Sequence, residues 1–324
     1  MMRKYRKIIS ICLIAGLLAA VLAAGYALYL QRIRRPLQII LVQKAIDETD
    51  FWVSVSKGAE IAARENGVEL TIWGPASERE TQDAHRLIED AIEARPDAIA
   101  LAPISYDETL PYARMIEEAG IPLILIDSVM AEPAGDGLVA TDNVEGGIKM
   151  GQYMRQYANE DTVIGIVGHV KGSSTATQRE QGVREGLGEY QDRIVEVVFC
   201  ESSFEIAYEV TKKMLEEHPE INMIAGLNEY SAVGAAEAVV DMGRAGSIRM
   251  VGFDSSIREI QLLEAGVFDA IVIQKPFNMG YLGIESAVKA ARGEPVEDNV
   301  DSGSVLVTKD TIYTEENQKL LFPF

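Results

Sequence analysis

The strongest constraint on the fold of this 324-residue chain is the regular alternation of two kinds of segment. From Leu37 onward, short apolar runs rich in β-branched residues alternate with amphipathic stretches at a spacing of roughly 25–30 residues. This alternation is typical of successive βα units and predicts an α/β fold with mainly parallel sheets. The apolar runs predict nine strands, at 38–43, 68–73, 97–102, 121–126, 162–168, 194–200, 222–227, 247–253 and 268–273.

The number of strands also bears on the domain organisation. Nine strands are too many for one simple nucleotide-binding half. The sequence therefore predicts two doubly wound, Rossmann-like lobes, with the change from one to the other near residue 141. No low-complexity segment or long linker separates them.

Four of the predicted strands end on a single polar residue. These residues are Asp127 in LILIDS, Asn228 in MIAGLNE, Asp254 in MVGFDSS and Gln274 in IVIQKP. The carboxyl ends of parallel strands face the crevice in which open α/β sheets bind ligands, so the four residues favour a neutral polyhydroxyl ligand. The alternative is local, because Asp and Asn also serve as turn or N-cap residues at such positions.

The charge of the chain bears on its partners. The formal net charge is −20, with 30 basic and 50 acidic residues. Residues 1–36 hold seven of the basic residues and no acid, which leaves 23 basic and 50 acidic residues, or −27, in the remainder. Such a body repels nucleic acid and anionic lipid head groups, so neither is expected to bind its surface.

Residues 1–36 predict an N-terminal membrane segment. Four Lys or Arg residues precede the uncharged run at 8–30, which at about 1.5 Å per residue can cross a hydrocarbon core of roughly 30 Å. Two outcomes remain open. The length of the run favours an uncleaved signal anchor, whereas the small residues Ala23 and Gly25 offer a signal-peptide cleavage site. Both outcomes place the body outside the cytoplasm.

The two cysteines predict neither a lipid anchor nor a disulfide. Cys12 lies early in the apolar run, where an ordinary apolar role explains it better than lipid attachment. Cys200 is the other cysteine, so the body has no partner for an intramolecular disulfide.

No residue pattern predicts catalysis, and no metal or other cofactor is expected. His85, His169 and His218 do not have the spacing of a metal pair, and surface or capping roles account for them. The stretch GIVGHVKGSS at 165–174 lacks the residue order of a phosphate-binding loop. We interpret it as a turn that leads into the next helix.

An ordered series of motifs over residues 38 to about 308 resembles the type I periplasmic sugar-binding proteins. These are the ribose- and galactose-binding kind, related to the ligand domains of LacI-type repressors. The motifs are DFWVSVSKGAE, RPDAIALAP, AGIPLILIDS, TDNVEGG, ATQREQGVREGL, HPEINMIAGLNEYSAVGA, IRMVGFDSS and VIQKP. The resemblance implies a ligand held between two lobes that three hinge crossings join.

The resemblance also implies the limits of the lobes. The crossings are expected near Thr141, Gln274 and Gly303. The implied domains are the N-terminal segment 1–36, a first lobe of 37–141 plus 275–303, and a second lobe of 142–274 plus 304–324.

Residue by residue, the resemblance implies seven ligand contacts. They are Phe51, Trp52, Asp127, Arg179, Asn228, Asp254 and Gln274. Carboxylates accept from two hydroxyl groups, a guanidinium donates through a planar fork, and amides do both. The two aromatic rings offer apolar faces to the C–H face of a sugar, and Phe204 is a candidate for an opposing ring.

Three of these assignments have alternatives. Phe51 and Trp52 are adjacent, so on a helix they point about 100° apart and at least one can belong to the core. Arg179 can equally form a surface pair with Glu180 or Glu185.

Departures from the pattern of related proteins widen the choice of ligand. Asp127 is followed by Ser128 where related binders often have Arg, so one forked donor is missing. Asp47, Glu48 and Asp50 in the first loop, and Glu229 after Asn228, predict a cleft mouth that is more acidic than usual. The alternative is that Asp47, Glu48 and Asp50 form a solvated acidic loop away from the ligand. These differences admit a polyol, a deoxy sugar, a signalling furanose or a ligand with an amino group.

Two functions follow from the resemblance. The first is an extracytoplasmic solute-binding protein that captures a sugar-like ligand for ABC-type import, with a membrane permease as its partner. The alternative is a membrane-tethered sensor that reports occupancy to a histidine kinase or chemoreceptor. A transcription regulator is disfavoured, because residues 1–36 supply an apolar segment in place of a helix-turn-helix.

Overall fold

The computed structural model describes residues 17–18, 20–23, 25–26, 35–47 and 49–321. The chain divides into two units, Met1–Leu37 and Gln38–Phe324. Most of the predicted membrane segment at 8–30 lies outside the described residues. Within the described part of the chain, no helix combines the length and the apolar character that crossing a membrane requires.

Six short strands form the first sheet, all paired in parallel. They are β1 (Gln38–Val42), β2 (Glu69–Trp73), β3 (Ala98–Leu101), β4 (Leu123–Ile126), β5 (Gly137–Ala140) and β11 (Asn299–Asp301). Their order across the sheet is β11-β5-β4-β3-β1-β2. The central strands are buried on both faces, which explains why each is a continuous apolar run in the sequence.

Six further strands form the second sheet. They are β6 (Ile164–Gly168), β7 (Ile194–Phe199), β8 (Met223–Gly226), β9 (Arg249–Phe253), β10 (Ala270–Gln274) and β12 (Ser304–Thr308). Their order is β12-β10-β9-β8-β6-β7, which repeats the arrangement of the first sheet strand for strand, with β9 in the place of β4. Only the edge strand β12 is antiparallel to its neighbour among these strands.

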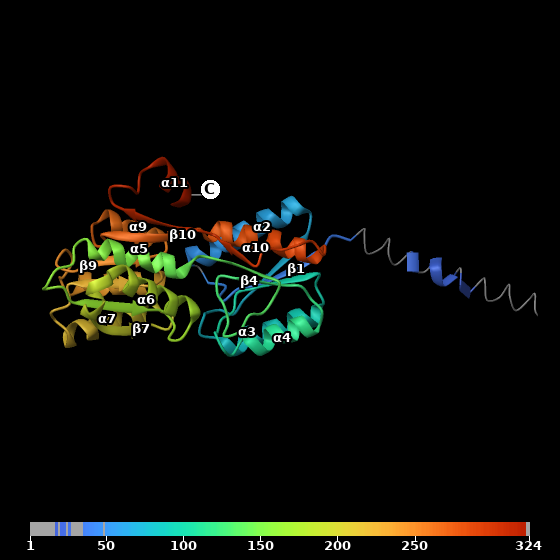
Figure 1. Cartoon of the computed structure of the whole chain (residues 1–324), viewed down its shortest axis with the longest axis horizontal. Coiled ribbons are helices and arrows are strands. Elements are labelled where there is room, and N and C mark those ends of the chain that lie inside the picture. The colour runs from blue at the N-terminus through green and yellow to red at the C-terminus, as the bar shows by residue number, and fades with distance from the viewer. Residues whose placement is uncertain (1–16, 19, 24, 27–34, 48, 322–324) are drawn as a thin grey trace, which may run out of the picture. The chain divides into compact units, whose positions relative to one another are not determined.

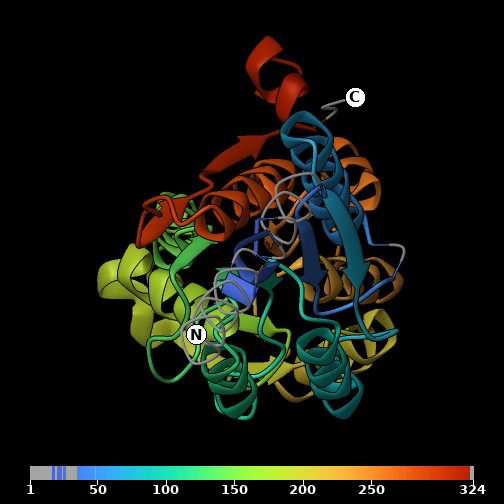
Figure 2. The ribbon, with the colours of Figure 1, turned by 90° about the vertical axis from the view of Figure 1, so that its right-hand side faces the viewer.

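Helices cover both faces of each sheet (Figures 1 and 2). On the first sheet, α2 (Asp50–Asn66) and α10 (Pro276–Ala291) pack together on one face, and α3 (Thr81–Ala94) and α4 (Leu110–Glu118) cover the other. We call this sheet with its helices the first lobe.

The second sheet is covered in the same way. The helices α5 (Asn143–Arg155) and α6 (Ser174–Leu187) pack on one face, and α7 (Phe204–Glu217), α8 (Glu229–Asp241) and α9 (Ile257–Glu264) pack on the other. The 3-10 helix η1 (Gly188–Arg193) follows α6, and α11 (Glu315–Leu321) adds Leu321 to the core on the α8 side. We call this sheet with its helices the second lobe.

Glycines allow the equivalent helix pairs α2/α10 and α5/α6 to approach closely. A Cβ atom on Gly58 would lie 2.0 Å from the carbonyl oxygen of Phe277, and one on Gly147 would lie 2.3 Å from that of Arg179. A side chain at either position would force the helices apart. The glycines of α5 and α6 thereby hold the Arg179 helix against the start of α5.

The chain passes between the two lobes three times. It leaves β5 at Ala140 and enters α5 at Asn143, passes from β10 to α10 at Lys275, and passes from β11 to β12 at Ser302 and Gly303. The first and third crossings are joined by a hydrogen bond of 3.1 Å between Thr141 Oγ1 and Ser302 Oγ. The exact limits of the lobes stay a prediction.

The predicted fold class is confirmed, since two doubly wound sheets are present, and all nine predicted strands exist within two residues of their expected ends. The prediction was incomplete, because it omitted β5, β11 and β12. These strands have three to five residues. The strand β11 has a polar sequence, NVD, so its pairing with β5 depends on tertiary contacts and not on an apolar run.

Candidate ligand-binding site

A cavity lies between the two lobes, at the carboxyl ends of the parallel strands. Its lining includes all seven residues that the sequence predicted as ligand contacts. Seven further residues complete it. The lining is Lys44, Thr49, Phe51, Trp52, Glu78, Asp127, His169, Thr175, Arg179, Asn228, Glu229, Tyr230, Asp254 and Gln274.

Asp127 and Asp254 occupy equivalent positions in the two lobes, directly after β4 and β9. Both have a left-handed backbone, with φ of 66° and 95°. Each donates its backbone N–H to the neighbouring strand, Asp127 to Val139 O at 3.0 Å and Asp254 to Val272 O at 2.9 Å. Positive φ is unusual outside glycine, although Asp tolerates it better than most residues, and such strain is concentrated at functional sites. The same local geometry therefore presents a carboxylate from each lobe to the cavity.

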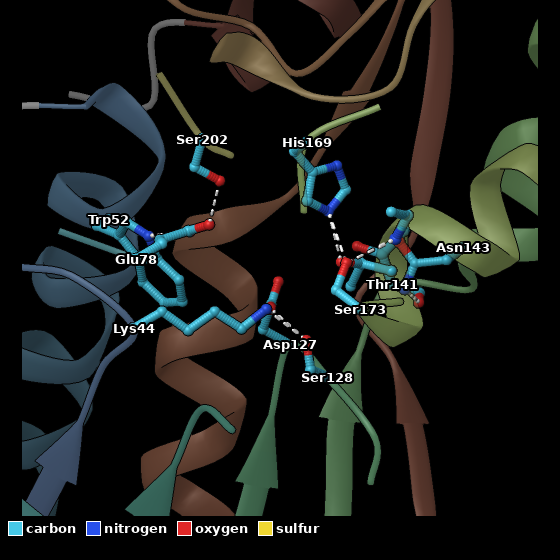
Figure 3. Close-up of polar contacts among 12 residues, drawn as sticks. Lys44, Trp52, Glu78, Asp127, Ser128, Thr141, Asn143, His169, Ser173 and Ser202 are labelled. Carbon is cyan, nitrogen blue, oxygen red and sulfur yellow. Dashed lines mark hydrogen bonds and ion pairs between the residues drawn. The ribbon is translucent and has the colours of Figure 1, made fainter. Parts of the chain in front are cut away.

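Lys44 forms a buried ion pair with Asp127 (Figure 3). Its Nζ lies 2.5 Å from Asp127 Oδ2 and 2.5 Å from Ser128 Oγ, which in turn donates to the same carboxylate. Burial by itself raises the pKa of Asp127, but the charge and hydrogen bond of Lys44 outweigh burial and lower this pKa below its ordinary value. Asp127 is therefore ionised. Sequence reasoning missed Lys44, although a lysine two residues after a buried strand was a usable signal.

Arg179 is buried, with 3% of its surface exposed. Its Nε donates to Asn143 Oδ1 at 2.8 Å, its Nη1 donates to Leu227 O at 2.7 Å, and its guanidinium lies 3.8 Å from the ring centre of Phe253. The alternative of a surface pair is wrong, because Glu180 pairs with Arg184 instead. Burial lowers the pKa of Arg179 and the surrounding carboxyl groups raise it, yet a guanidinium stays charged.

Asp254 has hydrogen bonds but no direct ion pair among the described residues. Its carboxylate accepts from Gln274 Nε2 at 2.6 Å and from the backbone N–H of Glu229 at 2.9 Å. Burial raises the pKa of Asp254, and the nearby charge of Arg179 offsets this only in part. The Oε1 atom of Gln274 is buried and has no hydrogen-bond partner within the described part of the chain.

Asn228 caps α8, which confirms the N-cap role that the sequence offered as an alternative to ligand contact. Its Oδ1 accepts from the backbone N–H and the hydroxyl of Ser231, and the two residues form a capping box. The cap uses the oxygen of the amide. Because Asn228 also lines the cavity, capping and ligand contact are compatible at this position.

Aromatic rings line the cavity on both sides. Phe51 and Trp52 form an edge-to-face pair with ring centres 5.0 Å apart, and both line the cavity although Trp52 is almost fully buried. Phe204 is absent from the lining. It is 37% exposed and packs at 4.8 Å on Tyr230, which supplies the second-lobe ring in its place.

The predicted surface or capping role of His169 is wrong. This residue follows β6, is 4% exposed and lines the cavity. Its Nε2 lies 2.8 Å from Thr175 Oγ1 and 3.3 Å from Ser173 Oγ, and Ser173 caps the Arg179 helix (Figure 3). Burial, followed by the charges of Arg179 and Lys44, lowers its pKa well below the ordinary value, so the ring is neutral. The interpretation of this stretch as a turn before a helix is confirmed.

His85 is buried as well. Its ring stacks on Tyr112 with the ring centres 4.1 Å apart. The predicted surface role of His85 is therefore wrong. His218 remains partly exposed beside Glu196 and Glu220.

Three carboxylates of the first lobe accept hydrogen bonds from the second lobe around the cavity. Asp47 accepts from the hydroxyl of Tyr230, Asp50 Oδ2 accepts from the backbone N–H of Ile257 at 2.9 Å, and Glu78 Oε2 accepts from Ser202 Oγ at 2.6 Å. The solvated-loop alternative is therefore wrong for Asp47 and Asp50, while Glu48 lies outside the described residues. The structure is that of a closed cleft.

Comparison with known proteins agrees with this architecture. A family model described as Periplasmic binding protein domain matches residues 39–295. The D-ribose/D-allose-binding protein of Pseudomonas aeruginosa is 27% identical over 272 residues, which cover 82% of this chain and 85% of that protein.

Two solved structures are similar to this chain over nearly all of their own length. A sugar transporter from Clostridium phytofermentans is 39% identical, with a TM-score of 0.80, and the match covers 85% of this chain and 100% of that one. An ABC transporter solute-binding protein from Agrobacterium vitis, with bound D-fucose, is 28% identical, with a TM-score of 0.83 and coverage of 88% and 100%. With two doubly wound lobes around one cavity, this chain belongs to the periplasmic binding protein family.

Proposed function

We propose that this protein is an extracytoplasmic solute-binding protein that encloses a sugar-like polyhydroxyl ligand between its lobes and delivers it to an ABC importer. The observation that carries the proposal is the convergence of strand-end carboxylates, amides and aromatic rings from both lobes on one closed cavity. Aromatic faces suit the C–H face of a sugar, and paired acceptors and donors suit its hydroxyl groups. The sugars named for the related proteins are consistent with this ligand class.

The seven predicted contacts divide between the lobes. Phe51, Trp52 and Asp127 belong to the first lobe, and Arg179, Asn228, Asp254 and Gln274 belong to the second. A ligand that touches both sets holds the lobes together. Closure therefore converts occupancy into a shape that a permease can recognise.

The first experiment measures melting of the full-length protein in detergent against a panel of D-ribose, D-allose, D-fucose, D-arabinose, hexosamines and polyols. A ligand that binds only the folded state at about 100 times its Kd adds roughly 2.7 kcal/mol of stability. If no compound raised the melting temperature, the proposed function would be wrong.

We also infer that residues 8–30 keep the protein at the outer face of the cytoplasmic membrane. The length of the uncharged run supports an anchor over a cleaved peptide. The mass of the protein isolated from membranes tests this inference. A mature N-terminus between residues 24 and 27 would rule out the anchor without affecting the binding proposal.

A further inference from the structure

Acidic residues outnumber cationic residues in the lining of the cavity. Within the described lining, two residues are cationic and four are acidic. The cationic residues are Lys44 and Arg179, and the acidic residues are Glu78, Asp127, Glu229 and Asp254. All except Glu78, which is partly exposed, are more than nine-tenths buried, so water screens the charges of these five poorly.

Both cations already have protein acceptors. Lys44 is bound to Asp127 and Ser128, and Arg179 donates to Asn143 and to the carbonyl oxygen of Leu227. Neither cation forms a direct ion pair with Glu78, Glu229 or Asp254 among the described residues. Lys44 balances Asp127 and also acts through space on Glu78, whereas Arg179 acts through space on Asp254, Asp127 and Glu78. Neither cation contributes to the pKa shift of Glu229.

Glu78 and Glu229 have no direct ion pair within the described lining. Glu78 accepts from Trp52 Nε1 at 3.2 Å and from Ser202 Oγ at 2.6 Å, and both donors are neutral. Burial raises the pKa of Glu78, and burial together with Asp254 raises the pKa of Glu229 to about 8. Glu229 therefore holds a proton near neutral pH, and a cation placed beside either carboxyl group would stabilise its ionised form.

We propose that the ligand of this cavity carries a protonated amine beside its hydroxyl groups, as an amino sugar or another polyhydroxylated amine does. The inference rests on the proposed function and deepens it. An ammonium group has three donors and no acceptor, which matches a lining with surplus carboxyl groups and with an unpartnered acceptor, Gln274 Oε1. Uronates and sugar phosphates, in contrast, would add negative charge to an acidic cavity.

The test uses matched sets of probes with the full-length protein in detergent. Each set contains a neutral hexose, its 2-amino-2-deoxy form, the N-acetyl derivative and the uronate, for the gluco and galacto series. Titration calorimetry gives the affinity of each probe. We expect an amine to bind about 10- to 100-fold more tightly than its neutral counterpart, because charge-assisted hydrogen bonds exceed neutral ones.

A second readout follows the protons. An amine that takes the place of the proton on Glu229 should release this proton on binding, which makes the calorimetric heat depend on the ionisation enthalpy of the buffer. A neutral hexose should show much less of this dependence. Equal proton release for both would contradict the role of Glu229.

The Glu78→Gln variant keeps the shape of the side chain and removes its charge. The ratio of amine to hexose affinity should fall at least about fivefold, whereas Glu60→Gln on the exposed face of α2 should leave the ratio unchanged. Melting without ligand confirms that each variant is folded.

The outcomes separate the inference from the proposed function. Hexoses that bind at least as tightly as their amines would overturn the amine but keep the sugar-binding function. If no probe bound and no other sugar stabilised the protein, the function itself would be wrong. An amine preference that survives in Glu78→Gln would remove Glu78 from the recognition of charge.

Discussion

The two lobes build the same turn at the cavity and give its carboxylate opposite surroundings. Asp127 after β4 and Asp254 after β9 share the left-handed backbone and the hydrogen bond to the neighbouring strand. In the first lobe, Lys44 reaches from the end of β1 and neutralises Asp127. In the second lobe, the position after β6 holds the neutral His169, and Asp254 has only neutral hydrogen-bond donors at contact distance.

This difference teaches that equivalent topology does not fix equivalent electrostatics. In the first lobe the charge of the carboxylate is balanced within the protein, so its removal disturbs a buried pair. In the second lobe the charge is left for a ligand. Loss of the cation beside Asp127 is therefore expected to reduce stability, and loss of Asp254 is expected to reduce affinity.

The largest expected effect is on the stability of the first lobe. Replacing Lys44 by Met leaves Asp127 buried without its cation and should lower the free energy of unfolding by about 3–5 kcal/mol. Chemical denaturation at neutral pH measures it, with Lys289→Met on the exposed face of α10 as the control. Adding Asp127→Asn should recover much of the loss. A Lys44→Met protein as stable as wild type would break the contrast between the lobes.

The next effect is a pH dependence that originates in the second lobe. Because the pKa of Glu229 is raised to about 8, the folded protein holds a proton there that the unfolded chain loses near 4.5. This contribution to stability is complete below about pH 4.5 and is lost as the pH rises from there through 8, at up to about 1.4 kcal/mol per pH unit. Asp127, whose pKa is lowered, contributes in the opposite sense, since its contribution is present above its ordinary pKa of 3.8 and is lost in stronger acid.

Denaturation curves between pH 5 and 9, for wild type and Glu229→Gln, check this dependence. The variant should be less sensitive to pH in this range. An unchanged slope would mean that Glu229 is ionised in the folded protein, and the proposed imbalance of charge in the cavity would weaken with it.

A smaller effect is expected on affinity at Asp254. The Asp254→Ala variant removes a buried acceptor and leaves hydroxyl groups of the ligand unpaired, which should cost about 1.5–3 kcal/mol, or roughly 10- to 150-fold in Kd. Without ligand, its stability should change little, in contrast to Lys44→Met. Calorimetry with the best sugar of the panel measures the loss, and Asp90→Ala on the exposed face of α3 is the control. Unchanged affinity would remove Asp254 from the site.

The smallest effect concerns closure. Ser202→Ala removes one hydrogen bond between the lobes, that to Glu78, and should weaken binding by about 0.5–1.5 kcal/mol, or roughly 2- to 13-fold. Small-angle scattering should show compaction with ligand in both proteins, at a higher ligand concentration for the variant. Binding without compaction in wild type would falsify the closure mechanism.

Much of the fold was predictable because the signals for it are local. Each buried parallel strand is an apolar run, and several helices begin at a residue whose side chain caps them, such as Ser173, Ser203 or Ser256. The prediction missed the short strands β5, β11 and β12 because three to five residues give too weak a hydrophobic pattern. The strand β11 depends on its pairing with β5.

Half of the cavity lining was also foreseen. Six of the seven predicted residues lie at the ends of strands or in the first turn of a helix, and Arg179 lies in the second turn of α6. All seven belong to distinctive sequence motifs. The sequence did not predict Lys44, Glu78, His169 and Tyr230 as lining residues, because the sequence around each does not distinguish it from an ordinary polar or aromatic residue. Their importance comes from partners far along the chain, such as Ser202, which is 124 residues from Glu78.

The sequence by itself determined that the chain forms two α/β lobes with polar residues at the carboxyl ends of their strands, because hydrophobic period and capping act over a few residues. Only the tertiary structure decided which of those residues meet. Lys44 reaches Ser128 and Asp127 because β1 and β4 flank β3 in one sheet, and no local pattern encodes that approach. The charge of each carboxylate depends on burial and on neighbours within a few ångströms, so the contrast between Asp127 and Asp254 exists only in the folded protein.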